Sequence, residues 1–425
     1  MPKVYLETYG CTLNQADSDI LRAVLIGNKH QIVDNEAESD VVVLNTCTVK
    51  GATDNKITER VRQLRKAGKR IVIAGCMTAN EAKLRKIAPL APLVGTSSLR
   101  NISDAVDDAM AGRGSTYKSY ESKDSLPKLL TAPIARIPIN DGCVSSCNFC
   151  QTKLARPFLR SYSPKTVVKW IDAAVAQGAK EIQLTSMDLG AYGLDIKTNL
   201  VALLDAIANN NSSTNQNTEF LVRLGMINPD HAKRMLPDII RLLKHKRFYR
   251  FIHIPVQTGS EKVCREMNRA HTVKDFVDIV EAIRKEIPEA TIATDIIVGY
   301  PTETEDDYEQ TKKLILQVKP DITNVSRFSP RPGTKAKELK QLPNPEVKRR
   351  STELAVLVKK IGEERRKAFI GKRYRVLITE KQKDFTGRNI NYSQVVVKGF
   401  KGRLGDSVDV EIVDANHGSL FGILI

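Results

Sequence analysis

The chain has 425 residues, of which 41% are hydrophobic and 27% are charged. This composition excludes a fibrous or disordered protein, and the length predicts about three domains. Lys and Arg exceed Asp and Glu by 17, which favours a polyanionic partner such as nucleic acid or an anionic membrane surface, with plain solvated charge as the alternative. No apolar run is long enough to span a bilayer, and the N-terminus is not typical of a secretion signal, so we predict a cytoplasmic protein without a membrane partner.

The first segment alternates β-branched runs with helical patterns, which predicts an α/β domain with a parallel sheet over residues 1–111. Residues 112–128 are rich in Gly, Ser and charge and have no clear period, which predicts a linker. The strands of the first domain are expected at Val4–Glu7, Val41–Asn45 and Ile71–Gly75.

The second segment, residues 129–345, repeats the strand and helix alternation and predicts a partial (βα)6 barrel. Such a barrel carries its functional residues at the carboxyl ends of its strands. The Asn/Ser stretch Asn209–Asn217 predicts a surface loop insertion. The six strands are expected at Ile134–Ile139, Glu181–Thr185, Phe220–Leu224, Phe251–Val256, Thr291–Val298 and Ile322–Arg327.

The third segment combines a basic helix over residues 346–370 with a glycine-containing β segment over residues 371–425. The β segment predicts a small antiparallel β-barrel. The basic residues of the helix predict contacts with RNA phosphates, and an exposed charged helix is the alternative. They are Lys348, Arg349, Arg350, Lys359, Lys360, Arg365, Arg366 and Lys367.

The strongest signal in the chain is the CxxxCxxC motif of Cys143, Cys147 and Cys150, directly after the first predicted barrel strand. A 4Fe-4S cluster ordinarily takes four cysteines, so three thiolates on one loop would leave one iron open for an exchangeable ligand. Zinc is the alternative, but it would need a fourth ligand from elsewhere and lacks its usual paired CxxC signature.

A second set of cysteines is Cys11, Cys47 and Cys76, each of which follows the end of one predicted strand of the first domain. Parallel strands end along one edge of a sheet, where open α/β folds bind ligands, so we expect the three thiols to converge on a second cluster. The alternative is that each is a small buried hydrophobic residue, which is the role we expect for the isolated Cys264.

The CxxxCxxC motif at the head of a βα barrel resembles the signature of the radical S-adenosylmethionine (SAM) superfamily. The words YGCTLNQADSD, LTSMDLGAYG, RLGMINP, HIPVQTGSEKVCREMNR and IIVGYPTETEDD resemble the methylthiotransferase family along essentially the whole chain. Within that family, YGCTLN and LTSMDLGAYG look most like the archaeal and eukaryotic branch that acts on N6-threonylcarbamoyladenosine. The C-terminal segment resembles the TRAM domain, a small RNA-binding β-barrel.

This resemblance implies methylthiolation of carbon 2 of N6-threonylcarbamoyladenosine beside the anticodon of tRNA, with two 4Fe-4S clusters and SAM as cofactors. It also implies an electron donor protein and a sulfur donor. Cys143, Cys147 and Cys150 would be catalytic and would ligate the cluster that binds SAM. The further SAM contacts are expected at Phe149, Asp188, Arg223 and Gln257, with a buried hydrogen-bond network as the alternative for the last three.

Other functions remain compatible with the same residues. Sister branches of the family act on isopentenyladenosine in tRNA or on an aspartate of a ribosomal protein. A different radical SAM enzyme with an auxiliary cluster would share the iron sites but would not need a basic C-terminal barrel. A zinc-dependent RNA-binding protein would share the cysteines and the charge but would be colourless.

Overall fold

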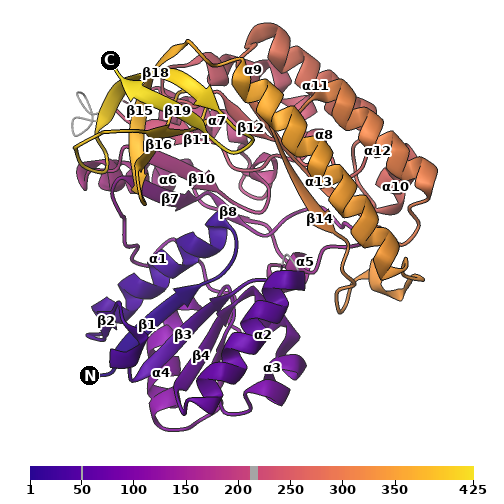
Figure 1. The fold of residues 1–425 in the computed structure, drawn as a ribbon. Helices are drawn as coiled ribbons and strands as arrows, with labels where there is room; N and C mark the ends of the chain where they lie inside the picture. The colour runs from indigo at the N-terminus through magenta and orange to yellow at the C-terminus, as the bar shows by residue number, and fades with distance from the viewer. Residues whose placement is uncertain (49–50, 211–218) are drawn as a thin grey trace.

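The computed structural model describes residues 1–48, 51–210 and 219–425 and contains a parallel sheet domain, a partial barrel, a long helix and a small closed barrel (Figure 1). Of the predicted loop insertion Asn209–Asn217, all but the first two residues lie outside the described part. Among the helices of the described part, none has the length and hydropathy needed to cross a membrane.

The N-terminal domain is a six-stranded parallel sheet in the order β2-β1-β3-β4-β5-β6. Every residue of the central strand β3 is buried, because helices α1 and α4 cover one face of the sheet and helices α2 and α3 cover the other. The predicted parallel α/β sheet is therefore confirmed. The strands are β1 (Lys3–Thr8), β2 (Gln31–Val33), β3 (Val41–Thr46), β4 (Arg70–Gly75), β5 (Leu93–Val94) and β6 (Thr116–Tyr117). The helices are α1 (Thr12–Gly27), α2 (Gly51–Lys66), α3 (Glu81–Ile87) and α4 (Ile102–Met110).

Residues 112–128 are more ordered than the predicted linker. They supply strand β6, which pairs with β5, and the Tyr117 hydroxyl donates a hydrogen bond of 2.7 Å to Asp108. They also supply the fully buried Lys123. This segment therefore belongs structurally to the N-terminal sheet and to its junction with the barrel.

The central domain is a partial barrel of six parallel strands, as predicted. Its strands form two three-stranded sheets, β7-β10-β11 and β12-β13-β14, which a parallel bridge between Met226 and His253 connects. β7 and β14 are the outer strands and do not pair with each other, so the barrel is open along one side. The strands are β7 (Ile134–Pro138), β10 (Glu181–Thr185), β11 (Leu221–Arg223), β12 (Phe251–His253), β13 (Thr291–Val298) and β14 (Ile322–Arg327). The helices that follow them include α6 (Pro164–Ala176), α7 (Leu200–Ala208), α8 (Pro229–Arg234), α9 (Leu236–Lys244), α10 (Glu261–Glu266), α11 (Val273–Glu286) and α12 (Glu305–Val318).

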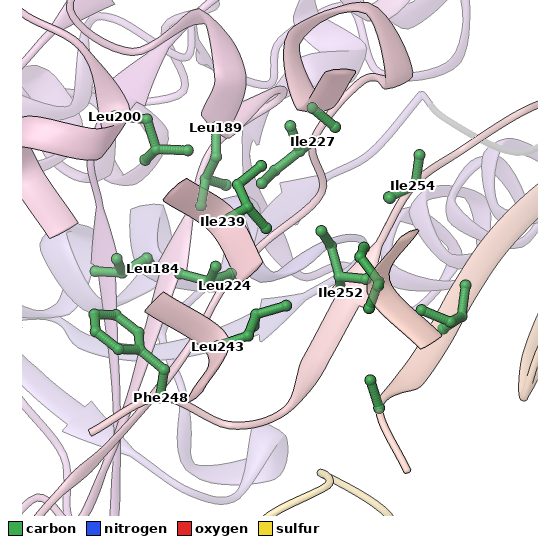
Figure 2. Packing of buried hydrophobic residues seen from close by; sticks show 14 of the residues in the cluster. Leu184, Leu189, Leu200, Leu224, Ile227, Ile239, Leu243, Phe248, Ile252 and Ile254 are labelled. Atoms are coloured by element: carbon green, nitrogen blue, oxygen red, sulfur yellow. The ribbon is translucent and has the colours of Figure 1, made fainter. Parts of the chain in front are cut away.

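Alternation along the barrel strands separates an apolar outer layer from a polar interior. Leu184, Leu224 and Ile252 pack against the surrounding helices in one large core (Figure 2). Their neighbours Gln183, Arg223 and His253 are only partly buried and point the other way, as a period of two requires. The barrel interior therefore carries polar side chains that remain in contact with solvent.

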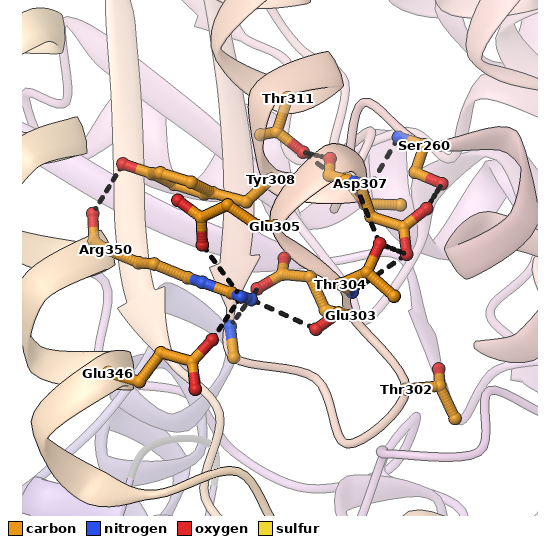
Figure 3. Close-up of polar contacts among 12 residues, drawn as sticks. Ser260, Thr302, Glu303, Thr304, Glu305, Asp307, Tyr308, Thr311, Glu346 and Arg350 are labelled. Carbon is orange, nitrogen blue, oxygen red and sulfur yellow. Dashed lines mark hydrogen bonds and ion pairs between the residues drawn. The ribbon is translucent and has the colours of Figure 1, made fainter.

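Helix α13 (Asn344–Lys367) runs along strand β14 and is attached to the barrel by a buried arginine. Arg350 is 1% exposed, and its guanidinium pairs with Glu303 at 2.7 Å, with Glu305 at 3.1 Å and with Glu346 (Figure 3). The Tyr308 hydroxyl donates a hydrogen bond of 3.0 Å to the Arg350 carbonyl oxygen. Arg350 thus has a structural role and does not face an RNA partner.

Other basic residues predicted to contact RNA phosphates are also engaged within the protein. Arg349 pairs with Glu305, Arg365 pairs with Asp321, and Lys367 pairs with Glu363, while Arg366 donates to two backbone carbonyls. The exposed lysines of this helix without a side-chain partner among the described residues are Lys348, Lys359 and Lys360.

The C-terminal domain is a closed five-stranded barrel in the order β15-β16-β17-β19-β18, which confirms the predicted small β-barrel. Its strands pair antiparallel as predicted, except for β17 and β19, which pair parallel. Its core contains Val376, Ile378, Val395, Val410 and Ile412. Strand β16 was not predicted, because the sequence FTGR carries little alternation. The strands are β15 (Arg373–Lys381), β16 (Phe385–Arg388), β17 (Gln394–Val397), β18 (Ser407–Ala415) and β19 (Leu420–Leu424).

The small barrel closes the amino-terminal end of the partial barrel. The Arg250 amide, just before β12, donates a hydrogen bond of 2.8 Å to the Ile390 carbonyl, and the ring of Tyr392 lies 4.9 Å from that of Phe251, the first residue of β12. The carboxyl ends of the barrel strands are left facing the N-terminal domain (Figure 1).

Candidate active site between two sheet edges

The carboxyl edges of the N-terminal sheet and of the partial barrel meet at one junction. Helix α5 (Thr152–Ala155), which follows the CxxxCxxC motif, packs on the short helix η2 (Cys76–Asn80) that follows β4. The Thr96 hydroxyl also donates a hydrogen bond of 2.7 Å to the Ala155 carbonyl. One predicted cysteine set therefore lies on each side of this junction.

The barrel cysteines are held on a tight loop that begins at a glycine. Gly142 has φ of 76°, and a Cβ added to it would lie 1.9 Å from the carbonyl oxygen of Phe158, so only glycine fits before Cys143. The loop is tightly folded, because the Cys150 amide donates a hydrogen bond of 3.1 Å to the Cys147 carbonyl and the Ser145 amide donates one of 3.4 Å to the Cys143 sulfur. Burial raises the pKa of the Cys143 and Cys150 thiols, and the nearby Asp188 carboxylate adds to the effect on Cys143.

The turn after helix α10 supports this loop. The Asn148 amide donates a hydrogen bond of 3.0 Å to the Met267 carbonyl, and the Asn268 side chain donates one of 2.8 Å to the Ser146 carbonyl. Arg269 donates from one guanidinium nitrogen to the Cys147 sulfur at 3.2 Å and from another to Asn228 at 2.6 Å. Arg269 thus joins the cysteine loop to the carboxyl edge of the barrel.

Two of the predicted SAM-contacting residues lie beside the cysteine loop, but they differ in exposure. Phe149 is partly buried and packs against Met267 and Tyr300. Asp188 is completely buried, and its carboxylate accepts hydrogen bonds from the Gly190 amide and from the amide and side chain of Asn228. Asp188 therefore positions Asn228, and its oxygens are already used within the protein.

The other two predicted SAM-contacting residues lie at different depths in the barrel. Gln257 is partly buried after β12 and has φ of 74°, a left-handed conformation that is costly for a residue other than glycine. In the strand register, Arg223 lies beside Gln183, which is in the middle of β10. The Cζ of Arg223 lies 5.1 Å from the ring centre of Phe251. Its position toward the amino-terminal end of the barrel gives no support to a SAM contact.

The N-terminal cysteines follow β1, β3 and β4, as the sequence predicted. Gly10 has φ of 113°, and a Cβ added to it would lie 2.7 Å from the Cβ of Cys47, so the glycine lets the loop of Cys11 approach Cys47. Cys11 and Cys47 both act electrostatically on Cys76. Burial raises the pKa of the Cys76 thiol to about 12, and the Arg156 guanidinium opposes this shift by its charge and a hydrogen bond.

Arg156 belongs to a buried network of charges that connects the two domains. Lys123 pairs with Asp17 at 2.7 Å and with Asp141 at 2.8 Å, and Arg156 pairs with the same two carboxylates. The side chains of Asp17, Lys123 and Arg156 are at most 2% exposed. Although burial alone would raise it, the charges of Lys123 and Arg156 hold the pKa of Asp141 well below its usual range.

The donor atoms of both sets fit iron–sulfur clusters. Each set consists of three cysteines, and cysteine thiolates are the usual ligands of such clusters. Each thiolate of a cubane cluster binds its own iron, so the sulfurs need not converge on one point. Within residues 1–48, 51–210 and 219–425, no group of three or more His, Cys, Asp or Glu residues is arranged around a single metal ion, which gives no support to the zinc alternative. Cys264 is buried in the barrel core, as predicted.

Three family descriptions match consecutive parts of the sequence. The uncharacterized protein family UPF0004 matches residues 3–95, the radical SAM superfamily matches residues 137–315, and the TRAM domain matches residues 367–425. A probable threonylcarbamoyladenosine tRNA methylthiotransferase of Archaeoglobus fulgidus is 40% identical over 99% of this chain and 98% of its own length. The threonylcarbamoyladenosine tRNA methylthiotransferase of Drosophila melanogaster is 34% identical over 100% of this chain and 78% of its own length.

The chain belongs to the threonylcarbamoyladenosine tRNA methylthiotransferase family. The resemblance predicted from the motifs is thereby confirmed, and Cys143, Cys147 and Cys150 lie in the radical SAM part of a methylthiotransferase. A solved structure of the radical SAM methyltransferase TsrM from Kitasatospora setae shares the fold, with a TM-score of 0.57 and 13% identity over 79% of this chain and 75% of that chain.

Motif analysis alone did not find several polar residues of this methylthiotransferase junction. Asp17, Lys123, Arg156 and Arg269 are single charged residues in the sequence, without a spacing that marks them. Arg156 follows the CxxxCxxC motif by six positions, and that proximity is the signal that would have singled it out.

Proposed function

We propose that this protein attaches a methylthio group to carbon 2 of N6-threonylcarbamoyladenosine in tRNA. The observation that carries the proposal is the meeting of two cysteine triads at the carboxyl edges of two parallel sheets, in a chain whose full length aligns with methylthiotransferases. In this proposal one triad ligates the cluster of the radical step, and the other ligates the cluster that carries or donates the sulfur. In this proposal residues 1–111 hold the second cluster and residues 129–345 the radical SAM site, while residues 346–370 and 371–425 contact tRNA.

In this proposal Cys143, Cys147 and Cys150 hold one 4Fe-4S cluster and Cys11, Cys47 and Cys76 hold the other. With SAM bound, the first cluster supplies radical chemistry, which suits an aromatic C–H bond that is not acidic enough for base catalysis. The thiols must lose their protons when iron binds, because only thiolates ligate the metal.

The chain's own residues hold these ligands in place. Arg269 donates to the Cys147 sulfur and Arg156 to the Cys76 thiol, so each triad has one guanidinium that offsets the negative charge of its thiolates. Asp188 fixes Asn228 at the mouth of the barrel. Phe149 and Gln257, partly buried near the cysteine loop, are proposed to contact SAM.

The tRNA contacts are proposed to come from exposed basic residues that have no side-chain partner within the described part of the chain. Lys348, Lys359 and Lys360 of α13 and Arg375 of the small barrel are of this kind. A loop nucleotide of the tRNA is proposed to enter the interior of the partial barrel. Single-stranded loop bases are the cheapest to extract from an RNA fold.

The partners that supply electrons and sulfur remain part of the proposal. The electron donor is expected to be a protein, and the sulfur donor is expected to be a separate molecule. A cytoplasmic location is also proposed, because seven cysteines without the spacing of a small disulfide scaffold favour metal ligation in a reducing compartment.

Mass spectrometry of tRNA nucleosides tests the substrate. Cells that lack this protein should accumulate N6-threonylcarbamoyladenosine and lack its 2-methylthio derivative. Loss of the isopentenyl derivative instead would assign the protein to the sister branch. Unchanged nucleosides would favour the ribosomal-protein aspartate.

Two triple variants test the division of roles between the cysteine sets. With Cys11, Cys47 and Cys76 replaced by Ala, iron should fall from roughly eight to roughly four per chain, and SAM cleavage should persist without methylthiolated RNA. With Cys143, Cys147 and Cys150 replaced, both activities should disappear. A circular dichroism melt of each variant checks that it folds. If the folded first variant keeps its iron and still modifies tRNA, the two-cluster assignment is wrong.

A further inference from the structure

Two arginines lie without ion-pair partners where the small C-terminal barrel meets the floor of the partial barrel. The Cζ of Arg223, from β11, lies 5.8 Å from the ring centre of Tyr392, and the Cζ of Arg388, from β16, lies 5.0 Å from the same ring. Two positive charges from different domains therefore flank one tyrosine. No described residue forms an ion pair with either guanidinium, and the buried Nε of Arg223 donates no hydrogen bond.

The surrounding residues hold this arrangement but do not neutralise it. The Tyr392 hydroxyl donates a hydrogen bond of 3.1 Å to Glu181, which also accepts hydrogen bonds from Tyr249 at 3.1 Å and from Gln183 at 2.7 Å. The Glu181 carboxylate is thus already engaged by three donors. Glu181 offsets one of the two positive charges at most, and the floor has an excess of positive charge.

Rigid packing fixes the positions of the two guanidiniums. Tyr392 has φ of 61°, a strained conformation for tyrosine, and its ring contacts the rings of Tyr249 and Phe251 at 4.8 and 4.9 Å between centres. Arg223 also lies over the Phe251 ring. Strained backbone and unpaired buried donors are typical of binding sites, where a ligand completes the interactions.

The floor is linked to the barrel interior that the proposed substrate would enter. Arg223 is partly exposed and faces inward beside Gln183, its register partner on β10. Asn228, at the cysteine loop, follows Arg223 by five residues, an extended length of no more than roughly 17 Å. A nucleoside placed with its base toward the cysteine loop can therefore direct a substituent toward the arginines.

We propose that Arg223 and Arg388 bind the carboxylate of the N6-threonylcarbamoyl group and thereby select this nucleoside over isopentenyladenosine. The inference rests on the proposed function and adds that the small barrel supplies part of the substrate site. Arginine binds carboxylates through paired N–H groups, and the isopentenyl group has no anion to offer. An RNA phosphate has the same anionic chemistry, and the salt dependence of binding distinguishes the two anions.

Binding of synthetic anticodon stem-loops to the full-length protein with its clusters tests the proposal, in the absence of SAM. Three stem-loops are compared by fluorescence anisotropy: one with N6-threonylcarbamoyladenosine, one in which the threonine carboxylate is a carboxamide, and one with isopentenyladenosine. The wild-type protein should bind the acid about 10- to 100-fold more tightly than the carboxamide, as expected for a charged hydrogen bond. Arg223→Gln and Arg388→Gln should each remove most of this preference and leave carboxamide binding unchanged.

Arg375→Gln is the matched control, because Arg375 is an exposed arginine of the same small barrel without a described partner. It should weaken all three stem-loops equally. If Arg223→Gln and Arg388→Gln behave like this control, and each flattens the log-log salt dependence by about 0.7 to 0.9, the arginines bind phosphate and the proposal is wrong. The proposal is also wrong if neither variant changes binding of the acid.

The outcomes separate this inference from the proposed function. If the wild-type protein modifies the threonylcarbamoyl stem-loop and prefers its acid form, but both variants keep that preference, only the arginine assignment fails. If the wild-type protein instead modifies the isopentenyl stem-loop, the proposed function fails as well. Should Arg223→Gln reduce the melting temperature, Arg388→Gln still decides, because its side chain belongs to a separate barrel.

Discussion

Replacement of Arg156 by Met should destabilise the junction between the N-terminal sheet and the barrel. Asp17 and Asp141 share Arg156 and Lys123 as partners, so the wild-type network contains two negative and two positive charges. Without Arg156, the two carboxylates would share one ammonium group, and one negative charge would stay buried and unbalanced. Removal of one partner from a buried ion pair costs about 3–5 kcal/mol.

Urea unfolding of the full-length protein, followed by circular dichroism, measures this loss. A cost of about 3 kcal/mol should lower the midpoint of the affected transition by roughly 1 M or more. Arg156→Met combined with Asp17→Asn restores charge balance, so the double variant should lose less than the sum of the single losses by more than about 1 kcal/mol.

The control is Arg113→Met, which breaks an ion pair with Asp108 whose arginine side chain is 65% exposed. Exposed pairs contribute about 0–1 kcal/mol, so this variant should change the midpoint little. If Arg156→Met costs no more than Arg113→Met, or if the cycle with Asp17→Asn is additive, the buried network does not stabilise the junction.

Three further predictions concern a buried acid, a strained residue and the basic helix α13. Burial raises the pKa of Asp19 to about 6 from an ordinary value of 3.8, so the folded state binds the proton more tightly and stability falls as pH rises between those values. Asp19→Asn should remove this fall and raise the free energy of unfolding at pH 7 by at most about 3 kcal/mol. An equal gain at pH 4 and pH 7 would contradict this prediction. Gln257→Gly should raise the melting temperature slightly, because glycine relieves the strain of the positive φ at this position. The same variant should weaken SAM binding in equilibrium dialysis. A lower melting temperature would mean that the Gln257 side chain is structural. Lys359→Gln and Lys360→Gln should each flatten the log-log salt dependence of tRNA binding by about 0.7 to 0.9, and an unchanged slope in filter binding would exclude the helix from the RNA interface.

Local sequence patterns were sufficient for the cysteine positions and for most strands, but not for the short strands β2, β5, β6 and β16. β3 and β4 are continuous apolar runs because both faces of the sheet are covered, and such runs can be read from a few adjacent residues. Because Cys11, Cys47 and Cys76 directly follow strands of one parallel sheet, their convergence followed from the strand assignment alone. The partial barrel and the small C-terminal barrel were predicted for the same reason.

The role of a charged side chain could not be predicted in this way. Arg350 and Lys360 look alike in the sequence as basic residues of one helix, yet Arg350 is buried against Glu303, which lies 47 positions away. Arg156 pairs with Asp17 across 139 positions, and Lys123 pairs with Asp17 across 106. No local pattern encodes such distant partners, so residues 112–128 were predicted only as a linker.

By itself the sequence determined the two cysteine triads, the order of the domains and the family, because these depend on spacing and on short periodic patterns. The tertiary structure alone decided which polar residues surround the triads and how deep Arg223 lies in the barrel. It also decided that the C-terminal barrel closes the floor of the central one, where Tyr392 meets Phe251. The physical reason is that ion pairing and burial depend on which surfaces meet after folding, and the residues that meet at the two junctions are far apart along the chain.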